Sequence, residues 1–284
     1  DWYPGAVLEP DKLLGFSKLI ETSRALFGMP FGQLQPKVSV IVPNFNHAPY
    51  LRRRLDSIYG QSYRQIEVWL LDDGSTDESL TILQEYADRY PDITRTLFNS
   101  KNSGGVFRQW AKGLKQATGS LIWIAESDDY CDDNFLEVLV RCFDDEAVML
   151  AYSKVEYVGA DEVPLPGGFT SFIEELPCHQ KWQQSYVNTA HKEVCQALGI
   201  LNTIPNVSGA LLRRPVDMPL LDAESWLSMQ VAGDWVFYLH LIRGGKLAFC
   251  TETTNYFRRS NTSVVAKKNQ QNISWMEWST ALQT

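Results

Sequence analysis

The sequence predicts an α/β fold in which a mostly parallel central sheet is flanked by helices. Three observations support this prediction. Short apolar runs alternate with amphipathic stretches of helical length between residues 37 and 158. Polar or acidic clusters follow several of the apolar runs, as is typical of the carboxyl ends of parallel strands. Finally, a chain of 284 residues with 44% hydrophobic content can bury the core of one large domain.

The first expected elements follow one another in regular order. Strands are expected at 38–42, 66–71, 94–98, 121–125 and 148–158, and helices at 50–59, 77–90, 106–117 and 135–143. A strand and a helix that alternate at this spacing form crossover connections, which place consecutive strands parallel in one sheet. We therefore expect helices on both faces of that sheet.

The remaining segments are less regular. After Gly159 we expect a helix at 182–198, a strand at 207–212, a helix at 234–242 and a strand at 246–251. An amphipathic stretch at 12–27 precedes the sheet, and the tail carries Trp275 and Trp278. These patterns divide the chain into an N-terminal helical arm or linker (1–36), a main domain (37–265) and a C-terminal tail (266–284).

Composition and charge exclude several classes of protein. A net charge of -8 and an isoelectric point of about 5.1 give no basic surface for nucleic acid or an anionic membrane. No apolar run is long enough to span a bilayer. Five cysteines without a C-x-x-C pair argue against zinc and disulfides and favour a reducing compartment. We expect a cytoplasmic protein, or one that is peripheral at the inner face of the membrane.

The first residue is Asp rather than Met, which indicates a piece excised from a longer chain. Further domains of that chain, or a peripheral membrane assembly, are therefore expected partners.

Three carboxylates follow the apolar run at 121–125, and they belong to Glu126, Asp128 and Asp129. Crowded carboxylates repel one another unless a cation or protons intervene. Hard oxygen ligands suit Mg²⁺ or Mn²⁺, which can bridge to phosphate oxygens. An acidic loop that only caps the helix after Asn134 would produce the same pattern. The cluster is therefore a candidate metal site, with a structural loop as its alternative.

Polar clusters also follow the first three expected strands, at Pro43–Asn46, Asp72–Asp77 and Asn102–Gly105. The carboxyl ends of parallel strands lie along one edge, so these loops should converge on the acids. Taken singly, each cluster could be only a turn or a helix start, and Phe45 could be a core residue. Together they favour a site with an aromatic face for a base, a carboxylate for the base or ribose, and a metal for a diphosphate.

Between about residues 37 and 263 the sequence resembles the family-2 glycosyltransferases, whose nucleotide-sugar-binding fold is called GT-A. Four of its segments are similar to the family's P-x-Y/F-N turn, D-D-G-S-x-D signature, D-x-D metal motif and E-D-x/W segment: Val38–Asn46, Asp72–Asp77, Glu126–Asp129 and Gly233–Trp235. Residues Tyr256–Asn261 look like the late loop that closes over the diphosphate.

The resemblance implies an inverting transferase that moves a sugar from a nucleoside-diphosphate sugar donor to an acceptor hydroxyl, with Mn²⁺ or Mg²⁺ as cofactor. The acceptor would be a glycan, a lipid-linked molecule or another hydroxyl compound, and bacterial surface polysaccharide is the default. Residues 37–158 would form the nucleotide-sugar-binding half of the main domain, and residues 159–265 the acceptor-binding half.

The resemblance also assigns roles to single residues. Phe45 would stack on the donor base, and Asp73 would form a hydrogen bond with it. Asp128 would bind the metal, while Glu126 would face the ribose or the metal. Asp234 would be the general base, although an Asp at this place could equally be an N-cap. The other residues expected at the nucleotide sugar are Pro43, Asn44, Asn46, Asn102, Gly104 and Arg259.

Three departures from the family pattern affect these expectations. Glu126 replaces the first Asp of D-x-D, and its longer side chain can reposition the metal. Residues Gln109–Ala111 stand where the family often has A-R-N or A-W-N, so a polar contact near the donor should be missing. Ser260 stands where many members have a His, which removes an imidazole metal ligand.

Two rival functions stay open. A sugar-phosphate nucleotidyltransferase would need a loop rich in Gly and Lys or Arg after the first strand, which this chain lacks. A non-catalytic nucleotide- or sugar-binding module is the alternative that Glu126 and Ser260 favour. An NAD enzyme is disfavoured, because no G-x-G-x-x-G motif follows the first strand.

Overall fold

A computed structural model of the protein describes residues 35–259, Glu277 and Ser279. The chain divides into two compact units, residues 1–35 and 36–284. The helix expected at 12–27, the departure at Ser260 and both tail tryptophans lie outside the described residues. In the described part of the second unit, nine strands form one sheet in which the main order is β3-β2-β1-β4-β8-β6-β9-β5.

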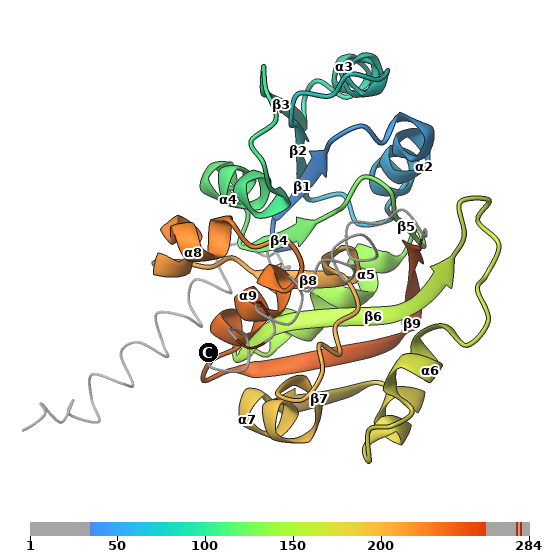
Figure 1. The fold of residues 1–284 in the computed structure, drawn as a ribbon, viewed down its shortest axis with the longest axis vertical. Coiled ribbons are helices and arrows are strands. Elements are labelled where there is room, and N and C mark those ends of the chain that lie inside the picture. Colours follow the sequence, from blue (N-terminus) through green and yellow to red (C-terminus); the bar gives the residue numbers. More distant parts are fainter. Residues whose placement is uncertain (1–34, 260–276, 278, 280–284) are drawn as a thin grey trace, which may run out of the picture. The chain divides into compact units, whose positions relative to one another are not determined.

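The first four strands form the parallel part of the sheet (Figure 1). They are β1 (Val38–Asn44), β2 (Ile66–Asp72), β3 (Thr94–Phe98) and β4 (Leu121–Ile124). The connecting helices are α2 (Ala48–Tyr59), α3 (Ser79–Arg89) and α4 (Val106–Gln116). All of these elements were expected from the sequence, with ends that differ by two residues at most. Parallel pairing brings the carboxyl ends of β1, β2 and β4 to the same edge.

The second half of the sheet is mixed. It contains β5 (Tyr130–Cys131), β6 (Val148–Val158), β7 (Tyr186–Thr189), β8 (Ala210–Arg213) and β9 (Lys246–Arg258). Strand β8 runs antiparallel to β4 and β6, whereas β6 and β9 are parallel partners. The predicted α/β class with a central sheet is confirmed, and β8 is the antiparallel strand that joins its two halves.

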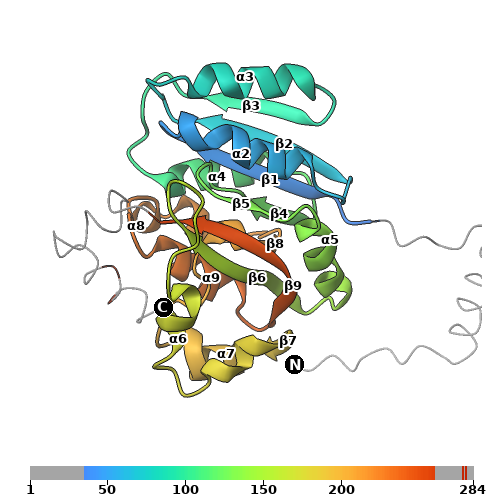
Figure 2. The ribbon, with the colours of Figure 1, turned by 90° about the vertical axis from the view of Figure 1, so that its right-hand side faces the viewer.

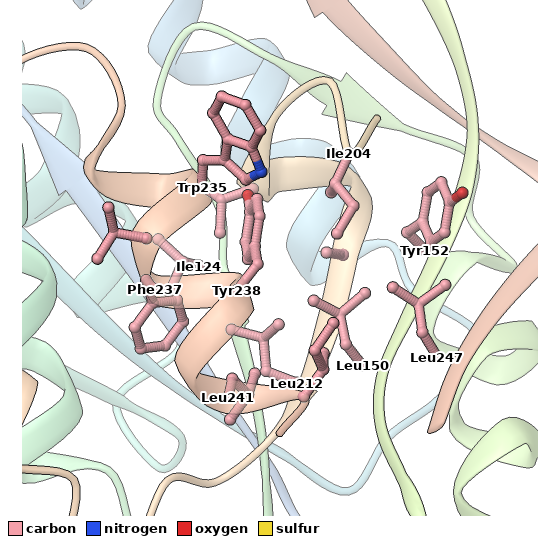
Figure 3. Packing of buried hydrophobic residues seen from close by; sticks show 14 of the residues in the cluster. Ile124, Leu150, Tyr152, Ile204, Leu212, Trp235, Phe237, Tyr238, Leu241 and Leu247 are labelled. Carbon is pink, nitrogen blue, oxygen red and sulfur yellow. The ribbon is translucent and has the colours of Figure 1, made fainter. Parts of the chain in front are cut away.

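Different helices cover the two faces of the sheet (Figure 2). In β4, Leu121 and Trp123 face the core beneath α2, α3 and α5 (Phe135–Val140), while alternate residues face the other core. That second core lies beneath α4, α8 (Glu224–Leu227) and α9 (Gly233–Leu241). Figure 3 shows Phe237 and Leu241 of α9 packed near Ile124. Helix α9 is therefore anchored by its apolar residues.

The helix expected at 182–198 is wrong for the first part of that segment. The segment holds a 3₁₀ turn (His179–Gln183), β7, the short helix α7 (Ala190–Glu193) and a π-helical turn (Val194–Leu198). Glu193 is buried, and it accepts hydrogen bonds from Lys181, Tyr186 and Asn188. This polar network and the pairing of β7 with β9 outweigh the helical spacing of the apolar residues.

The other elements connect these strands. They are a 3₁₀ turn after α5 (Arg141–Asp144), α6 (Gly168–Ile173), and 3₁₀ turns at Val207–Gly209 and Pro219–Asp222. The strand expected at 207–212 therefore begins later, and the one expected at 246–251 extends to Arg258. In the described part of the chain, no helix has the length and apolar character needed to cross a membrane. The five cysteines are free.

Candidate active site

The main chain of the acidic loop after β4 is fixed by contacts from distant segments. The Glu126 N–H donates to Ser208 Oγ at 3.0 Å, and the buried Arg54 donates through Nε to the Glu126 carbonyl at 3.0 Å. His47 Nδ1 lies 2.8 Å from Ser127 Oγ. The loop is therefore held at the sheet edge by α2, by the turn before α2 and by the segment before β8.

Asp129 has a structural role in this loop. Its Oδ2 accepts from Asn206 Nδ2 at 2.6 Å, and its Oδ1 accepts from the Arg258 N–H at 2.9 Å. The side chain is buried. Burial, followed by the charge of Asp128, raises the pKa of its carboxyl. Asp129 thus ties the acidic loop to the end of β9 and to the segment before β8.

Glu126 and Asp128 are the acids of this loop that remain available. Both are partly exposed, and no hydrogen bond within the described part of the chain engages either carboxylate. Burial raises the pKa of Glu126 well above its usual range, and the charges of Asp128, Asp129 and Asp234 add to this effect. A cation would relieve this repulsion.

The donor set fits a hard divalent cation, but only in part. Among the described residues, no three His, Cys, Asp or Glu side chains gather as a metal site. Glu126 and Asp128 could supply two oxygen ligands, and the others would have to come from a diphosphate and water. This is the usual arrangement for Mg²⁺ at phosphate-binding sites, where carboxylates act together with substrate oxygens.

The loops after β1 and β2 are locked together. Asp72 accepts hydrogen bonds from Asn44 Nδ2 at 2.9 Å and from Ser75 Oγ at 2.6 Å. Gly74 has a φ of +77°, and a Cβ at this position would lie 2.8 Å from the Asn102 nitrogen. Glycine is therefore required here both for the backbone conformation and for the approach of the loop after β3.

Asp73 lies at the centre of a polar network. The carboxylate is 4% exposed. Its Oδ1 accepts from Asn99 Nδ2 at 2.7 Å, from the Ser103 N–H at 2.9 Å and from Gln109 Nε2 at 2.7 Å. Among the described residues, only Ser103 Oγ donates to its Oδ2, at 2.8 Å. Gln109 therefore supplies a polar contact to Asp73, and Asp73 Oδ2 keeps a lone pair for another donor.

The other residues expected at the nucleotide sugar surround this network. Phe45 is 42% exposed, so it is not a core residue. Asn46 has a φ of 55° and accepts from the Thr76 N–H at 2.8 Å. Asn102 accepts from the Gly104 N–H at 2.8 Å. Pro43 is buried in β1, where it pairs with a residue of β2. The structure therefore brings the loops after β1, β2 and β3 together, as the sequence predicts.

Asp234 is the second residue of α9 and does not cap this helix, because the N-cap is Ala232. Its Oδ1 accepts from the Trp235 N–H at 2.7 Å, and its Oδ2 accepts from Asn202 Nδ2 at 3.2 Å. Burial is the main cause that raises the pKa of Asp234 to about 7. Asp234 therefore accepts from an N–H of the first turn of its own helix without being the N-cap residue, and its raised pKa would let the carboxyl exchange a proton near neutral pH.

Tyr238 lies one turn beyond Asp234 on α9, and Figure 3 shows its ring beside Trp235. Its hydroxyl is buried and has no hydrogen-bond partner in the described part of the chain. Burial raises the pKa of this phenol, and the charges of Asp234 and Glu126 raise it further. The phenol belongs to the same helix as Asp234, and α9 packs in the same core as Ile124, the last residue of β4 before the acidic loop.

The two arginines at the end of β9 have different surroundings. Arg258 is buried, donates through Nε to the Asp128 carbonyl at 2.9 Å and lies 4.5 Å from the ring centroid of Tyr50. Arg259 is exposed, and its guanidinium lies 5.3 Å from the ring centroid of Tyr157. Arg258 is a structural clamp, whereas the Arg259 side chain packs on the outer aromatic residues of β6 and β9.

Sequence reasoning missed several residues of the site. They are Arg54, Gln109, Asn202, Asn206, Ser208 and Tyr238. Most of them contact the acids across large sequence separations, and only Gln109 and Tyr238 lie in segments whose motif or helical spacing could have indicated a role. The candidate site thus combines the acidic loop, the loops after β1, β2 and β3, and the start of α9.

Solved structures of other proteins share this fold. The chain superimposes on residues 1-349 of S. aureus TarS in complex with UDP-GlcNAc with a TM-score of 0.60 and 22% identity, and the match covers 81% of this chain and 60% of that fragment. For the mannosyltransferase PcManGT of Pyrobaculum calidifontis, in complex with GDP-Man and Mn²⁺, the TM-score is 0.62 at 18% identity, with coverage of 95% and 72%. These likenesses show that the chain has the GT-A fold.

The sequence assigns the family. Residues 39–200, more than half of the chain, match the family described as Glycosyl transferase family 2. The chain belongs to this family.

Curated relatives match only through a segment. The chain is 29% identical over 135 residues to the chondroitin synthase of Pasteurella multocida, a match that covers 47% of this chain and 14% of the synthase. In four further bacterial relatives, the matched segment covers 15% to 40% of the relative's length.

Proposed function

We propose that this protein is an inverting, metal-dependent transferase that moves a sugar from a nucleoside-diphosphate sugar to an acceptor hydroxyl. One observation carries the proposal. Helix α9, whose first turn carries Asp234, packs through Phe237 in the same core as Ile124, and the acidic loop begins two residues after Ile124 (Figure 3). This packing supports a single site for a candidate general base and candidate metal ligands.

The loops after β1, β2 and β3 would hold the donor. The exposed ring of Phe45 can stack on a base, and Asp73 Oδ2 can accept one more hydrogen bond from a base N–H. Asn44, Asn46, Asn102 and Gly104 would shape this part of the site, and Arg259 would contact the diphosphate. TarS and PcManGT, with UDP-GlcNAc and GDP-Man, support a nucleotide-sugar donor.

Glu126 and Asp128 would hold Mn²⁺ or Mg²⁺. The Mn²⁺ in the PcManGT structure supports this assignment, as does the mutual repulsion of the acids. A divalent cation here would offset the charge that develops on the leaving diphosphate. The two carboxylates belong to one short loop whose main chain is fixed by Ser208 and Arg54. The main chain that carries them would therefore need little rearrangement when the donor binds.

Asp234 would accept the proton of the acceptor hydroxyl. A carboxyl whose pKa is near 7 is a better base at neutral pH than an ordinary Asp, because its conjugate acid is weaker. No covalent intermediate is required, because the hydroxyl attacks the anomeric carbon directly. Similarity to a chondroitin synthase supports a growing polysaccharide as the acceptor.

A donor-turnover assay tests this function. Wild-type protein is incubated with UDP- and GDP-sugars and Mn²⁺, and the released nucleoside diphosphate is measured with and without candidate acceptor glycans. We expect slow release without acceptor and faster release with the correct one. A binding module would retain the nucleotide sugar without cleaving it, and that result would refute the proposal.

A further inference from the structure

A carboxylate from the C-terminal segment contacts the chain just before the candidate base. Glu277 Oε1 accepts from the Gln230 N–H at 2.8 Å. Its Oε2 accepts from the N–H groups of Val231 and Ala232 at 2.7 and 2.9 Å. Helix α9 starts at the next residue, Gly233, and Asp234 follows. One side chain thus binds three consecutive main-chain donors at the entrance to this helix.

These donors have no other partner in the described part of the chain. The first N–H groups of a helix, and those just before it, lack intrahelical acceptors. The N-cap residue Ala232 provides no side-chain acceptor, and the Asp234 carboxylate accepts from the Trp235 N–H and from Asn202 instead. A negative charge at this end of a helix is also favoured by the helix dipole. Glu277 therefore completes the N-terminus of α9.

The residues on either side of these donors are held differently. A Cβ on Gly233 would lie 2.5 Å from the Phe107 ring, and the Trp226 indole donates to the Gly233 carbonyl at 2.7 Å. The Trp235 indole donates to another main-chain carbonyl at 2.7 Å. Aromatic residues thus fix residues 233 and 235, whereas Glu277 fixes residues 230–232. Without Glu277, the loop that leads to the base would lose its anchor.

We propose that Glu277 is a positioning residue for glycosyl transfer, which holds residues 230–232 so that the Asp234 carboxylate faces the acceptor hydroxyl. This inference rests on the proposed role of Asp234 as the base. Displacement of a reacting group by about 1 Å can reduce the rate on the order of 10²-fold. Loss of the three bonds should therefore slow turnover more than it weakens donor binding, because the donor loops lie on other strands.

Turnover of three variants tests the positioning role. The donor is the UDP- or GDP-sugar that the wild-type protein cleaves fastest. With this donor, Glu277→Ala should lower kcat by about 10–100-fold and leave KM for the donor unchanged. Glu277→Gln keeps one acceptor oxygen, so its kcat should lie between those of wild type and Glu277→Ala. Glu146→Ala removes an exposed acid just before β6 and should match wild type. Formate should restore kcat of Glu277→Ala in a saturable manner, since its carboxylate can occupy the freed N–H groups.

Amide hydrogen exchange at residues 230–232 gives a readout that needs no turnover. These amides should exchange slowly in wild type, faster in Glu277→Ala, and slowly again when formate is added. Equal exchange in wild type and Glu277→Ala would overturn the contact itself. Wild-type kcat in Glu277→Ala would overturn the positioning role. A wild-type chain with protected amides but no turnover on any donor would instead overturn the proposed function, and the positioning role with it.

Discussion

The proposed chemistry depends most on one carboxyl group, that of Asp234. Asp234→Asn keeps the size and the hydrogen-bonding oxygen but cannot accept a proton. We expect kcat to fall by about 10²–10⁴-fold while donor binding persists. In wild type, kcat should rise with pH through about 7, because the base is active only when deprotonated. An unchanged rate in Asp234→Asn with a verified acceptor would place the base elsewhere, and Glu224 or Asp222 would be examined next.

The same residue makes a prediction for stability. In the unfolded chain an Asp carboxyl loses its proton at about pH 4. In the folded chain Asp234 keeps its proton up to about pH 7. Between these values the folded state binds more protons, so the contribution of Asp234 to stability falls as pH rises. Asp234→Asn should lack this fall, and denaturant unfolding at pH 5 and pH 8 measures it. If the variant and wild type lose equal stability over this interval, Asp234 does not have a raised pKa.

The metal assignment is tested at Asp128. Asp128→Asn removes one charged oxygen ligand from a partly exposed loop, so metal-dependent donor binding should disappear while the fold is unaffected. Titration of a nucleoside diphosphate with and without Mn²⁺ measures this difference. Asp92→Asn, an exposed Asp before β3, is the matched control. Unchanged Mn²⁺ dependence in Asp128→Asn would refute the assignment.

Substitution of Phe45 distinguishes a role in nucleotide binding from a role in stability. The ring is 42% exposed, so Phe45→Ala should lower the melting temperature only slightly. Nucleotide binding should weaken by about 1–3 kcal/mol through lost stacking on the base. Calorimetric titration and thermal unfolding of the same variant measure both quantities. A large drop in melting temperature with unchanged affinity would instead assign Phe45 to the core.

At the scale of elements, the junction between the loops after β2 and β3 depends on Gly74. Gly244 has a similar φ of +75° but open space where a Cβ would be. Gly244→Ala should therefore cost about 1–2 kcal/mol from backbone strain alone. Gly74→Ala should cost about 1–3 kcal/mol more, because its Cβ meets the main chain at residues 101 and 102. Equal losses in chemical denaturation would show that the close approach is not required.

The first half of the fold could be predicted almost completely from the sequence. Its strands are continuous apolar runs that end in turn residues, so local pattern and final structure agree. The segment at 182–198 could not be predicted, because its apolar residues have helical spacing while the buried Glu193 network favours a strand and short turns. The second part of β9 is polar, so its sequence pattern predicts a loop. It forms a strand because it pairs with β6 and β5.

Part of the candidate site could also be predicted from the sequence. The residues that follow β1, β2 and β4 are indicated by position, since parallel strands end at one edge. The structural role of Asp129 was not predictable, because its partners Asn206 and Arg258 lie 77 and 129 residues away. The same holds for Glu277 and the N–H groups before α9, which are 45 to 47 residues apart.

At the scale of the whole molecule, the sheet brings together two halves with different tasks. We propose that residues 37–158 bind the nucleotide sugar through the loops after β1, β2, β3 and β4, while the acceptor half contributes Asp234 through α9. The antiparallel strand β8 joins them, and Asp129 connects the acidic loop to both β9 and the segment before β8. The central claim is that these parts form one metal-dependent nucleotide-sugar site.

Thermal unfolding of the wild-type chain with nucleoside diphosphates tests this claim most directly. UDP, GDP, ADP, CDP and dTDP are each added with and without Mn²⁺. One of them, with Mn²⁺ present, should stabilise the chain by about 2.7 kcal/mol at a concentration a hundredfold above its dissociation constant. The same nucleotide without Mn²⁺ should have a much smaller effect. If no nucleoside diphosphate raises the melting temperature at any Mn²⁺ concentration, the account of the site is contradicted.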